Sequence, residues 1–159
     1  ISLASTTFVG QNLGNNQPQR ARKGVTIALI LSVSATALMM IPVVIFAAPV
    51  VAFFNDKPEV IQYGSMLLRW ISPFYILCCF NQIYVSALRG AGNSRAPMVI
   101  LLLSYVGFRQ LYLLGMSNIC NEIIPIAMSY PAGWLLCSTV TLIYYSRVNL
   151  AKNRLVDDK

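Results

Sequence analysis

The residues best placed to do chemistry lie inside apolar stretches of the sequence, where polar side chains recur at helical spacing. Within residues 96–117, steps of 4, 3 and 4 place three such side chains and a methionine on one side of a helix. Arg109 is the most informative, because a lone arginine in hydrocarbon costs at least about 2.5 kcal/mol and is by default a functional-site hypothesis. The alternative is that Arg109 extends toward a surface or pairs with a carboxylate elsewhere in the complete protein. The set consists of Tyr105, Arg109, Tyr112 and Met116.

A second stripe of polar side chains runs through residues 60–88. Its six members follow steps of 3, 3, 4, 3 and 4, which keeps them on one side of a helix. They either line a polar, water-filled passage or make hydrogen bonds that hold neighbouring helices together, and the sequence leaves both interpretations open. The stripe consists of Arg69, Ser72, Tyr75, Cys79, Gln82 and Ser86, with Asn81 at its border.

Aromatic side chains dominate one face of residues 123–146. Aromatic rings that face a cavity can hold flat organic cations against their π faces. The alternative is that these rings pack against other helices or lie at a membrane surface. The face carries Tyr130, Trp134, Cys137, Thr141 and Tyr144.

Enzymatic and metal chemistry find little support in the sequence. The 159 residues contain no histidine, which excludes a His-based triad, a His-ligated metal ion and a histidine proton relay within them. The four cysteines have neither metal-binding nor redox spacing, and each is interpreted as a small buried apolar residue. We therefore predict no catalytic residue, no metal site, no cofactor and no enzymatic activity.

The composition favours a membrane protein. Hydrophobic residues make up 57% of the chain and charged residues only 11%, and the mean hydropathy is +0.63. Soluble domains carry about 25% charged residues, so this chain has too few charges to cover a soluble surface. Four apolar stretches exceed the roughly 20 residues that a helix needs to cross a bilayer. The predicted fold class is an all-α polytopic membrane helix bundle.

Four full membrane spans are expected after the end of a preceding membrane helix. The first span is longer than a bilayer requires, and Pro42 and Pro49 are its expected kink points. The predicted segments are the end of a preceding helix at 1–14, a cytoplasmic loop at 15–23, a four-helix unit at 24–148 with spans at about 24–54, 60–88, 96–117 and 123–146, and a cytoplasmic tail at 149–159.

The basic residues predict the orientation of these spans. Nine of the twelve Lys and Arg residues lie at 20–23, 89–95 and 147–159, all on one side of the predicted spans. By the positive-inside rule, that side and both ends of the chain face the cytoplasm of a plasma (inner) membrane. The net charge of +7 therefore reflects topology. Because no basic stripe with interleaved aromatics occurs, we expect membrane lipid and no nucleic acid among the partners.

None of the five carboxylates lies inside a predicted span. Coupling to protons or sodium generally needs an acid or a cluster of oxygen ligands within the membrane. If the protein is ion-coupled, that acid must come from a part outside these residues. The five are Asp56, Glu59, Glu122, Asp157 and Asp158.

Two connecting segments resemble signatures of the multidrug and toxic compound extrusion (MATE) transporters. Residues 8–24 read FVGQNLGNNQPQRARKG and residues 87–98 read ALRGAGNSRAPM, similar to QxLGAxxxxRAR-type and RGxGDTRxPM-type loops of that family. The resemblance continues in FRQLYL at 108–113 and YPAGW at 130–134. It implies that the chain is the end of helix eight plus helices nine to twelve, most of the carboxy-terminal lobe of a twelve-helix transporter whose amino-terminal lobe is missing here.

The resemblance also implies a function. A member would export organic cations or drugs by antiport with sodium or protons, with the coupling ion held in the missing amino-terminal lobe and access alternating about a central cleft. The small organic substrate would contact the cleft candidates Tyr75, Gln82, Arg109, Tyr112, Tyr130 and Trp134. The loop-motif residues, expected to form turns between helices rather than a ligand site, are Gly10, Gln11, Gly14, Arg89, Gly90, Gly92, Arg95 and Pro97.

The sequence departs from the family pattern in two places. Asn93 stands where the family loop often has aspartate, and residues 70–88 lack the carboxylate that some branches use for cation coupling. The first alternative function is a flippase for lipid-linked oligosaccharide or polysaccharide of the same wider fold, in which Arg69 and Arg109 would grip phosphate. The second is a non-transporting membrane assembly subunit, in which the polar stripes only pack helices.

Overall fold

The computed structural model describes residues 1–119 and 123–148, and these residues form helices and turns without strands. Four helical stretches are long and apolar enough to cross a membrane, so the predicted all-α polytopic bundle is confirmed. The predicted tail at 149–159, with Cys120 and Glu122, lies outside the described residues. The four stretches are Pro18–Ile45, Pro58–Gly90, Arg95–Met116 and Ile124–Arg147.

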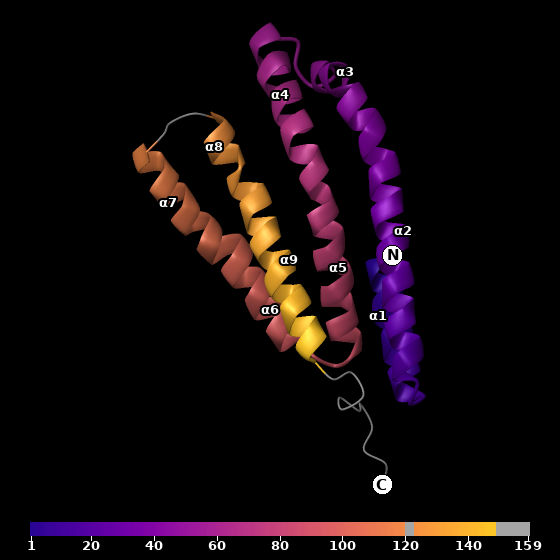
Figure 1. Cartoon of the computed structure of the whole chain (residues 1–159). Helices are drawn as coiled ribbons and strands as arrows, with labels where there is room; N and C mark the ends of the chain where they lie inside the picture. The colour runs from indigo at the N-terminus through magenta and orange to yellow at the C-terminus, as the bar shows by residue number, and fades with distance from the viewer. Residues whose placement is uncertain (120–122, 149–159) are drawn as a thin grey trace.

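The helical stretches are divided into shorter elements (Figure 1). A 3₁₀ turn, Ser72–Phe74, joins α4 to α5, and a π-helix, Leu103–Phe108, joins α6 to α7. The α-helices are α1 (Ser2–Gly14), α2 (Pro18–Ile45), α3 (Ala47–Ala52), α4 (Pro58–Ile71), α5 (Tyr75–Gly90), α6 (Arg95–Leu102), α7 (Arg109–Ile119), α8 (Ile123–Ala127) and α9 (Ser129–Arg147).

Proline explains where two of the stretches break. Pro49 has no N–H to donate to the carbonyl of Ile45, the last residue of α2. In the same way Pro131 cannot bond the carbonyl of Ala127, the last residue of α8. Pro42, the other expected kink point, lies inside α2, which continues past it to Ile45.

Helix α2 begins earlier than the predicted first span. Pro18 is its first residue, where the missing N–H and fixed φ of proline suit a helix start. The connection from α1 therefore narrows to 15–17, closed by a hydrogen bond from the Gln17 N–H to the Asn12 carbonyl. Residues 18–23 are helical, and their cytoplasmic location stays a prediction.

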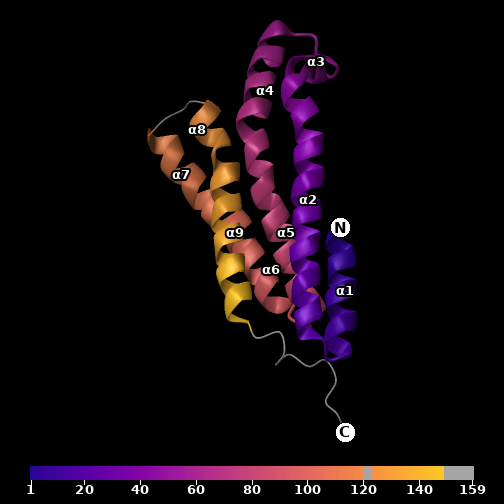
Figure 2. The ribbon, with the colours of Figure 1, turned by 45° about the vertical axis from the view of Figure 1, so that its right-hand side comes forward.

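The turns that carry the basic residues lie at one end of the bundle. In Figures 1 and 2 the α1–α2 turn, the α5–α6 turn and the end of α9 lie together, opposite the α3–α4 connection. This arrangement matches the alternation of the four predicted spans.

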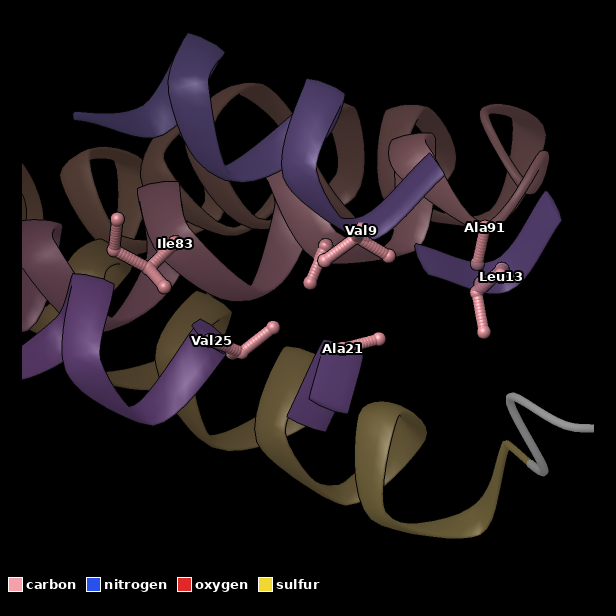
Figure 3. Close-up of a cluster of buried hydrophobic side chains, with 7 residues drawn as sticks. Val9, Leu13, Ala21, Val25, Ile83 and Ala91 are labelled. Carbon is pink, nitrogen blue, oxygen red and sulfur yellow. The ribbon is translucent and has the colours of Figure 1, made fainter. Parts of the chain in front are cut away.

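Helices α1, α2 and α5 pack around a cluster of buried apolar side chains (Figure 3). In a bilayer the hydrophobic effect does not drive helices together, because lipid tails are as apolar as the side chains. Close contact between small and medium side chains therefore holds these helices together. The cluster consists of Val9, Leu13, Ala21, Val25, Ile83, Ala87 and Ala91.

On the other side of α5, helix α9 lies between α5 and the stretch formed by α6, the π-helix and α7 (Figures 1 and 2). Because α9 contacts both neighbours, residues of α5 and of the π-helix lie close to the same helix in the interior of the bundle. The candidate site lies in this part of the bundle.

Candidate functional site

A buried polar cluster joins α5, the π-helix and α9. Asn81 is only 1% exposed, and its side-chain amide donates a hydrogen bond to the Tyr105 hydroxyl. The Thr141 hydroxyl donates to the Asn81 carbonyl oxygen at 3.5 Å, and the Cys137 thiol lies 4.0 Å from that hydroxyl. Both polar ends of Asn81 are thus satisfied, so the cluster fixes the three elements against one another.

A cavity of about 260 Å³ lies directly beside this cluster, and Tyr105 belongs to both. The π-helix ends one residue before Arg109, and α9 begins at Ser129, so the cavity is framed where two helices start. Insertions of π-helix into α-helices are frequent at functional sites. The cavity is lined by Tyr105, Arg109, Ser129, Tyr130, Gly133 and Trp134.

Arg109 brings a positive charge into the cavity wall. Its guanidinium carbon lies 3.8 Å from the centre of the Tyr130 ring, a cation–π contact between α7 and α9. The Nε atom of Arg109 is buried and has no hydrogen-bond partner within the described ranges. At about 1.5 Å per residue, Arg109 lies roughly 20 Å along the helix from Ala96 and about 12 Å from Ser117, well inside the span.

Ser129 adds a second polar group without a partner. The residue is 1% exposed, and its hydroxyl makes no hydrogen bond to any described residue. Most buried hydroxyl groups in proteins have a partner, so an orphaned one at a cavity wall calls for an explanation.

Aromatic rings continue from the cavity toward α5. Trp134 lies 6.2 Å from Tyr130 and 5.1 Å from Tyr75, measured between ring centres. We call Tyr130, Trp134 and Tyr75 the aromatic row. The rings are tilted against one another, at 54° and 45°, and place aromatic surface next to the arginine.

The MatE family model matches residues 1–112, which is more than half of the chain. The chain belongs to the MATE family. Members of this family are transporters and not enzymes. Together with the four candidate spans, this shows a multi-pass membrane protein.

Three curated relatives are similar to this chain over part of their length. A "FAD transporter" of Shewanella oneidensis is 32% identical over 64% of this chain and 23% of its own. A "Probable multidrug resistance protein NorM" of Thermotoga maritima is 28% identical over 65% of this chain and 22% of its own. A "Multidrug resistance protein MdtK" of Proteus mirabilis is 27% identical over 77% of this chain and 27% of its own. The matched part of this chain spans about a quarter of the length of these relatives.

Of the six cleft residues predicted for this MATE chain, the structure brings four together. Arg109, Tyr130 and Trp134 line the cavity, and Tyr75 joins them through Trp134. Tyr112 instead donates a hydrogen bond from its hydroxyl to the Pro125 carbonyl at 3.1 Å, which ties α7 to α8.

Gln82, the sixth, is exposed on α5 and is not among the residues that line the cavity. Its neighbour Asn81, which the sequence places only at the border of the polar stripe, is the buried one. The assignment of Gln82 to a cleft stays a prediction.

The polar stripe of residues 60–88 divides between packing and exposure. Cys79 is buried, and its thiol donates to the Thr36 hydroxyl of α2 at 3.1 Å. The Ser72 hydroxyl is bonded to the Leu68 carbonyl within its own stretch. For these residues the structure shows hydrogen bonds within and between helices, which is one of the two interpretations left open by the sequence.

The glycines of the MATE loop motifs serve two purposes. Gly90 ends α5 where it crosses α1, and a Cβ atom there would lie 2.4 Å from the Thr6 carbonyl oxygen. Gly10 lies on the facing side of the same crossing. Gly92 adopts φ 80° in the turn that follows, a conformation that favours glycine. The motif therefore forms a helix crossing as well as the expected turn.

The other loop-motif residues lie at the same end of the bundle. Pro97 is buried in the first turn of α6, as expected. Gly14 ends α1 in open space. Gln11, Arg89 and Arg95 are exposed.

Asn93, which replaces the usual aspartate of the MATE loop, links three segments. Its side-chain amide donates to the Tyr144 hydroxyl at 2.7 Å, and its carbonyl oxygen accepts the Ala96 N–H at 3.3 Å. An amide can donate and accept at once, whereas a carboxylate only accepts. Asn93 thereby connects the turn, the start of α6 and the end of α9.

Several residues of the site were outside the predicted cleft set, among them Tyr105, Ser129, Gly133 and Asn81. Tyr105 shares the helical face of Arg109, and Ser129 directly precedes the YPAGW segment, so both had a weak signal in the sequence. The contact of Asn81 with Tyr105 had none, because it depends on how α5 rotates after the 3₁₀ turn.

Proposed function

We propose that this chain forms most of the carboxy-terminal lobe of a secondary transporter that exports organic compounds across the inner membrane by antiport with sodium or protons. Membership of the MATE family supports it, as do relatives named for multidrug resistance and FAD transport. The cavity inside the spans, with Arg109, Tyr130 and Trp134 at its wall, is the observation that carries it.

The size of the cavity supports a two-lobed arrangement. Pockets that enclose drug-sized ligands measure about 300–1,000 Å³ and cover most of the ligand. At about 260 Å³ this cavity accommodates one part of such a compound. The remainder requires a second surface, which we assign to an amino-terminal lobe that rocks against this one during alternating access.

The coupling ion is assigned to that other lobe. No Asp or Glu occurs in the sequence between Glu59 and Glu122, or between Glu122 and Asp157. Proton and sodium sites in transporters use acids or oxygen ligands near the bilayer midplane. With the basic turns in the cytoplasm, the substrate enters this lobe from inside and leaves outside.

Dye transport by the complete transporter in proteoliposomes tests the proposal. We expect efflux to need a sodium or proton gradient and to fall about tenfold in Trp134→Ala. Trp70→Ala is the matched control, because Trp70 is 55% exposed on α4 and lies outside the cavity. Efflux that ignores both gradients would contradict antiport, and equal rates in the two variants would contradict the site.

The flippase alternative receives less support. It needs arginines that converge on a phosphate, but Arg69 is exposed on α4 and is not among the residues that line the cavity beside Arg109. Movement of a lipid-linked phosphate without any export of organic dyes would favour it over the present proposal.

A further inference from the structure

The charge of the cavity separates two classes of substrate. An organic cation would need the face of an aromatic ring, but Arg109 already lies against the Tyr130 ring at 3.8 Å. A second cation would also meet the guanidinium at close range, where the low dielectric of a membrane interior strengthens the repulsion. The Tyr130 side of the cavity is therefore unfavourable for a positive group.

Arg109 has no balancing charge among the residues that the structure describes. It makes no ion pair with a described residue, and no Asp or Glu occurs in the sequence between Glu59 and Glu122. Arginine within a bilayer is costly unless it is paired or hydrated. A ligand that brings a negative charge would remove this cost, whereas a positive one would add to it.

The unpartnered polar atoms of the cavity are suited to an acceptor. The Arg109 Nε–H is a donor only, and the Ser129 hydroxyl can donate as well. An ionised carboxylate only accepts, and hydrogen bonds from an arginine to it are roughly twice as strong as neutral ones. Both residues line one cavity, so a carboxylate bound there would lie beside both of them.

From these observations we propose that the cavity binds the carboxylate of an aromatic organic acid, with Arg109 and Ser129 as its donors and Trp134 of the aromatic row stacking on its ring. The proposal rests on the proposed export function and specifies its substrate class. It replaces the organic cation expected from the sequence with an anionic or zwitterionic aromatic compound.

Two dyes with the same ring system test the charge preference. Fluorescein carries a carboxylate and is anionic at neutral pH, whereas rhodamine 123 carries an ester in its place and is cationic. Binding of each dye to the complete transporter in nanodiscs is measured by fluorescence anisotropy. We expect fluorescein to bind at least about tenfold more tightly, and benzoate to displace it where benzylammonium does not.

Variants then assign the preference to residues. Arg109→Gln should weaken fluorescein binding about tenfold or more and leave rhodamine 123 binding unchanged or improved. Arg109→Lys should restore part of the affinity, because it returns the charge without the planar fork. Arg69→Gln is the matched control, since it removes another arginine of the spans from outside the cavity. Ser129→Ala should cost a smaller factor, about threefold to tenfold.

The outcomes separate this inference from the function on which it rests. Tighter binding of rhodamine 123 to the unmodified protein, or equal losses in Arg109→Gln and Arg69→Gln, would overturn the inference even where gradients drive dye export. Fluorescein that binds as expected but is moved by neither gradient would uphold the cavity assignment and refute antiport. The dye and benzoate comparison on unmodified protein holds even if a variant fails to fold.

Discussion

Around Val9 and Ile83, where α1, α2 and α5 meet, side chains are fully covered and helices approach to backbone contact. Around Arg109, where α7 and α9 meet, a cavity remains, Tyr130 is 43% exposed, and buried polar atoms lack partners. Both regions belong to one bundle. The first region has the packing of a structural core, and the second retains the unsatisfied groups that a ligand would use.

The difference indicates where this lobe is built to be rigid and where it is built to bind. Membrane helices associate through small residues and close packing, which the α1–α5 crossing shows at Gly90. Functional sites commonly lack such close packing or leave polar groups without partners, and other parts of the fold then supply the stability. Substitution of a closely packed residue in the first region should therefore lower stability, whereas removal of the unpaired charge of Arg109 in the second should raise it.

The largest effect is expected from Gly90→Val. Its Cβ would lie 2.4 Å from the Thr6 carbonyl oxygen, and backbone cannot move aside as a flexible side chain can. We expect a loss of about 3 kcal/mol or more in the free energy of unfolding, measured by SDS titration of the purified protein in micelles. Gly14→Val is the matched control, because nothing lies within 4 Å of a Cβ there. Equal losses would show that the crossing is not tightly packed.

Asn81→Ala should give the next largest effect. It removes both hydrogen bonds that the Asn81 side chain makes, so the Tyr105 hydroxyl loses its donor and the Thr141 hydroxyl loses its acceptor in the interior. A loss of about 2 kcal/mol is expected in the same titration. Gln82→Ala, one residue along but exposed, should change stability by less than about 0.5 kcal/mol. A larger loss of stability in Gln82→Ala than in Asn81→Ala would show that Gln82, and not Asn81, faces the interior of the bundle.

Arg109→Met should act in the other direction. Methionine keeps much of the length of the side chain while removing a charge that has no partner in the spans, so unfolding should become harder by about 1–2 kcal/mol. Binding of an anionic aromatic dye should fall in the same variant. A destabilised Arg109→Met protein would mean that Arg109 is paired in the complete transporter and belongs with the rigid region.

The smallest effect is expected from Tyr144→Phe. It removes the hydrogen bond from Asn93 and so loosens the link between the α5–α6 turn and α9, for a loss of about 1 kcal/mol. Tyr145→Phe is the control, since Tyr145 contacts the Tyr84 ring at 4.8 Å and removal of its hydroxyl leaves that stacking in place. Thermal melting of the two proteins side by side distinguishes them.

The helix bundle could be predicted from the sequence because the features that define each membrane span lie within that span. Runs of apolar residues define spans wherever they occur, and Pro49 ends α2 because of its own missing N–H. The grouping of Arg109 with Tyr130 and Trp134 was also predictable, since a buried charge and facing aromatics on two spans suggest a common cleft.

The contacts that were not predictable depend on rotation of one helix against another. Pro73 lies in the 3₁₀ turn Ser72–Phe74, and the altered helical register after it decides that Asn81 rather than Gln82 faces α9. Ser129 carries no pattern that distinguishes an orphaned hydroxyl from a bonded one, because its lack of a partner is a property of three-dimensional packing.

The π-helix Leu103–Phe108 has a consequence for comparing this chain with its relatives. Its hydrogen bonds span five residues instead of four, so the segment absorbs one extra residue while the helix on either side keeps its direction. A relative whose corresponding span is an unbroken α-helix will therefore align with a one-residue gap inside 103–108. An alignment without that gap would pair Arg109 with the wrong residue of the relative. An arginine that both proteins share would then be scored as a substitution.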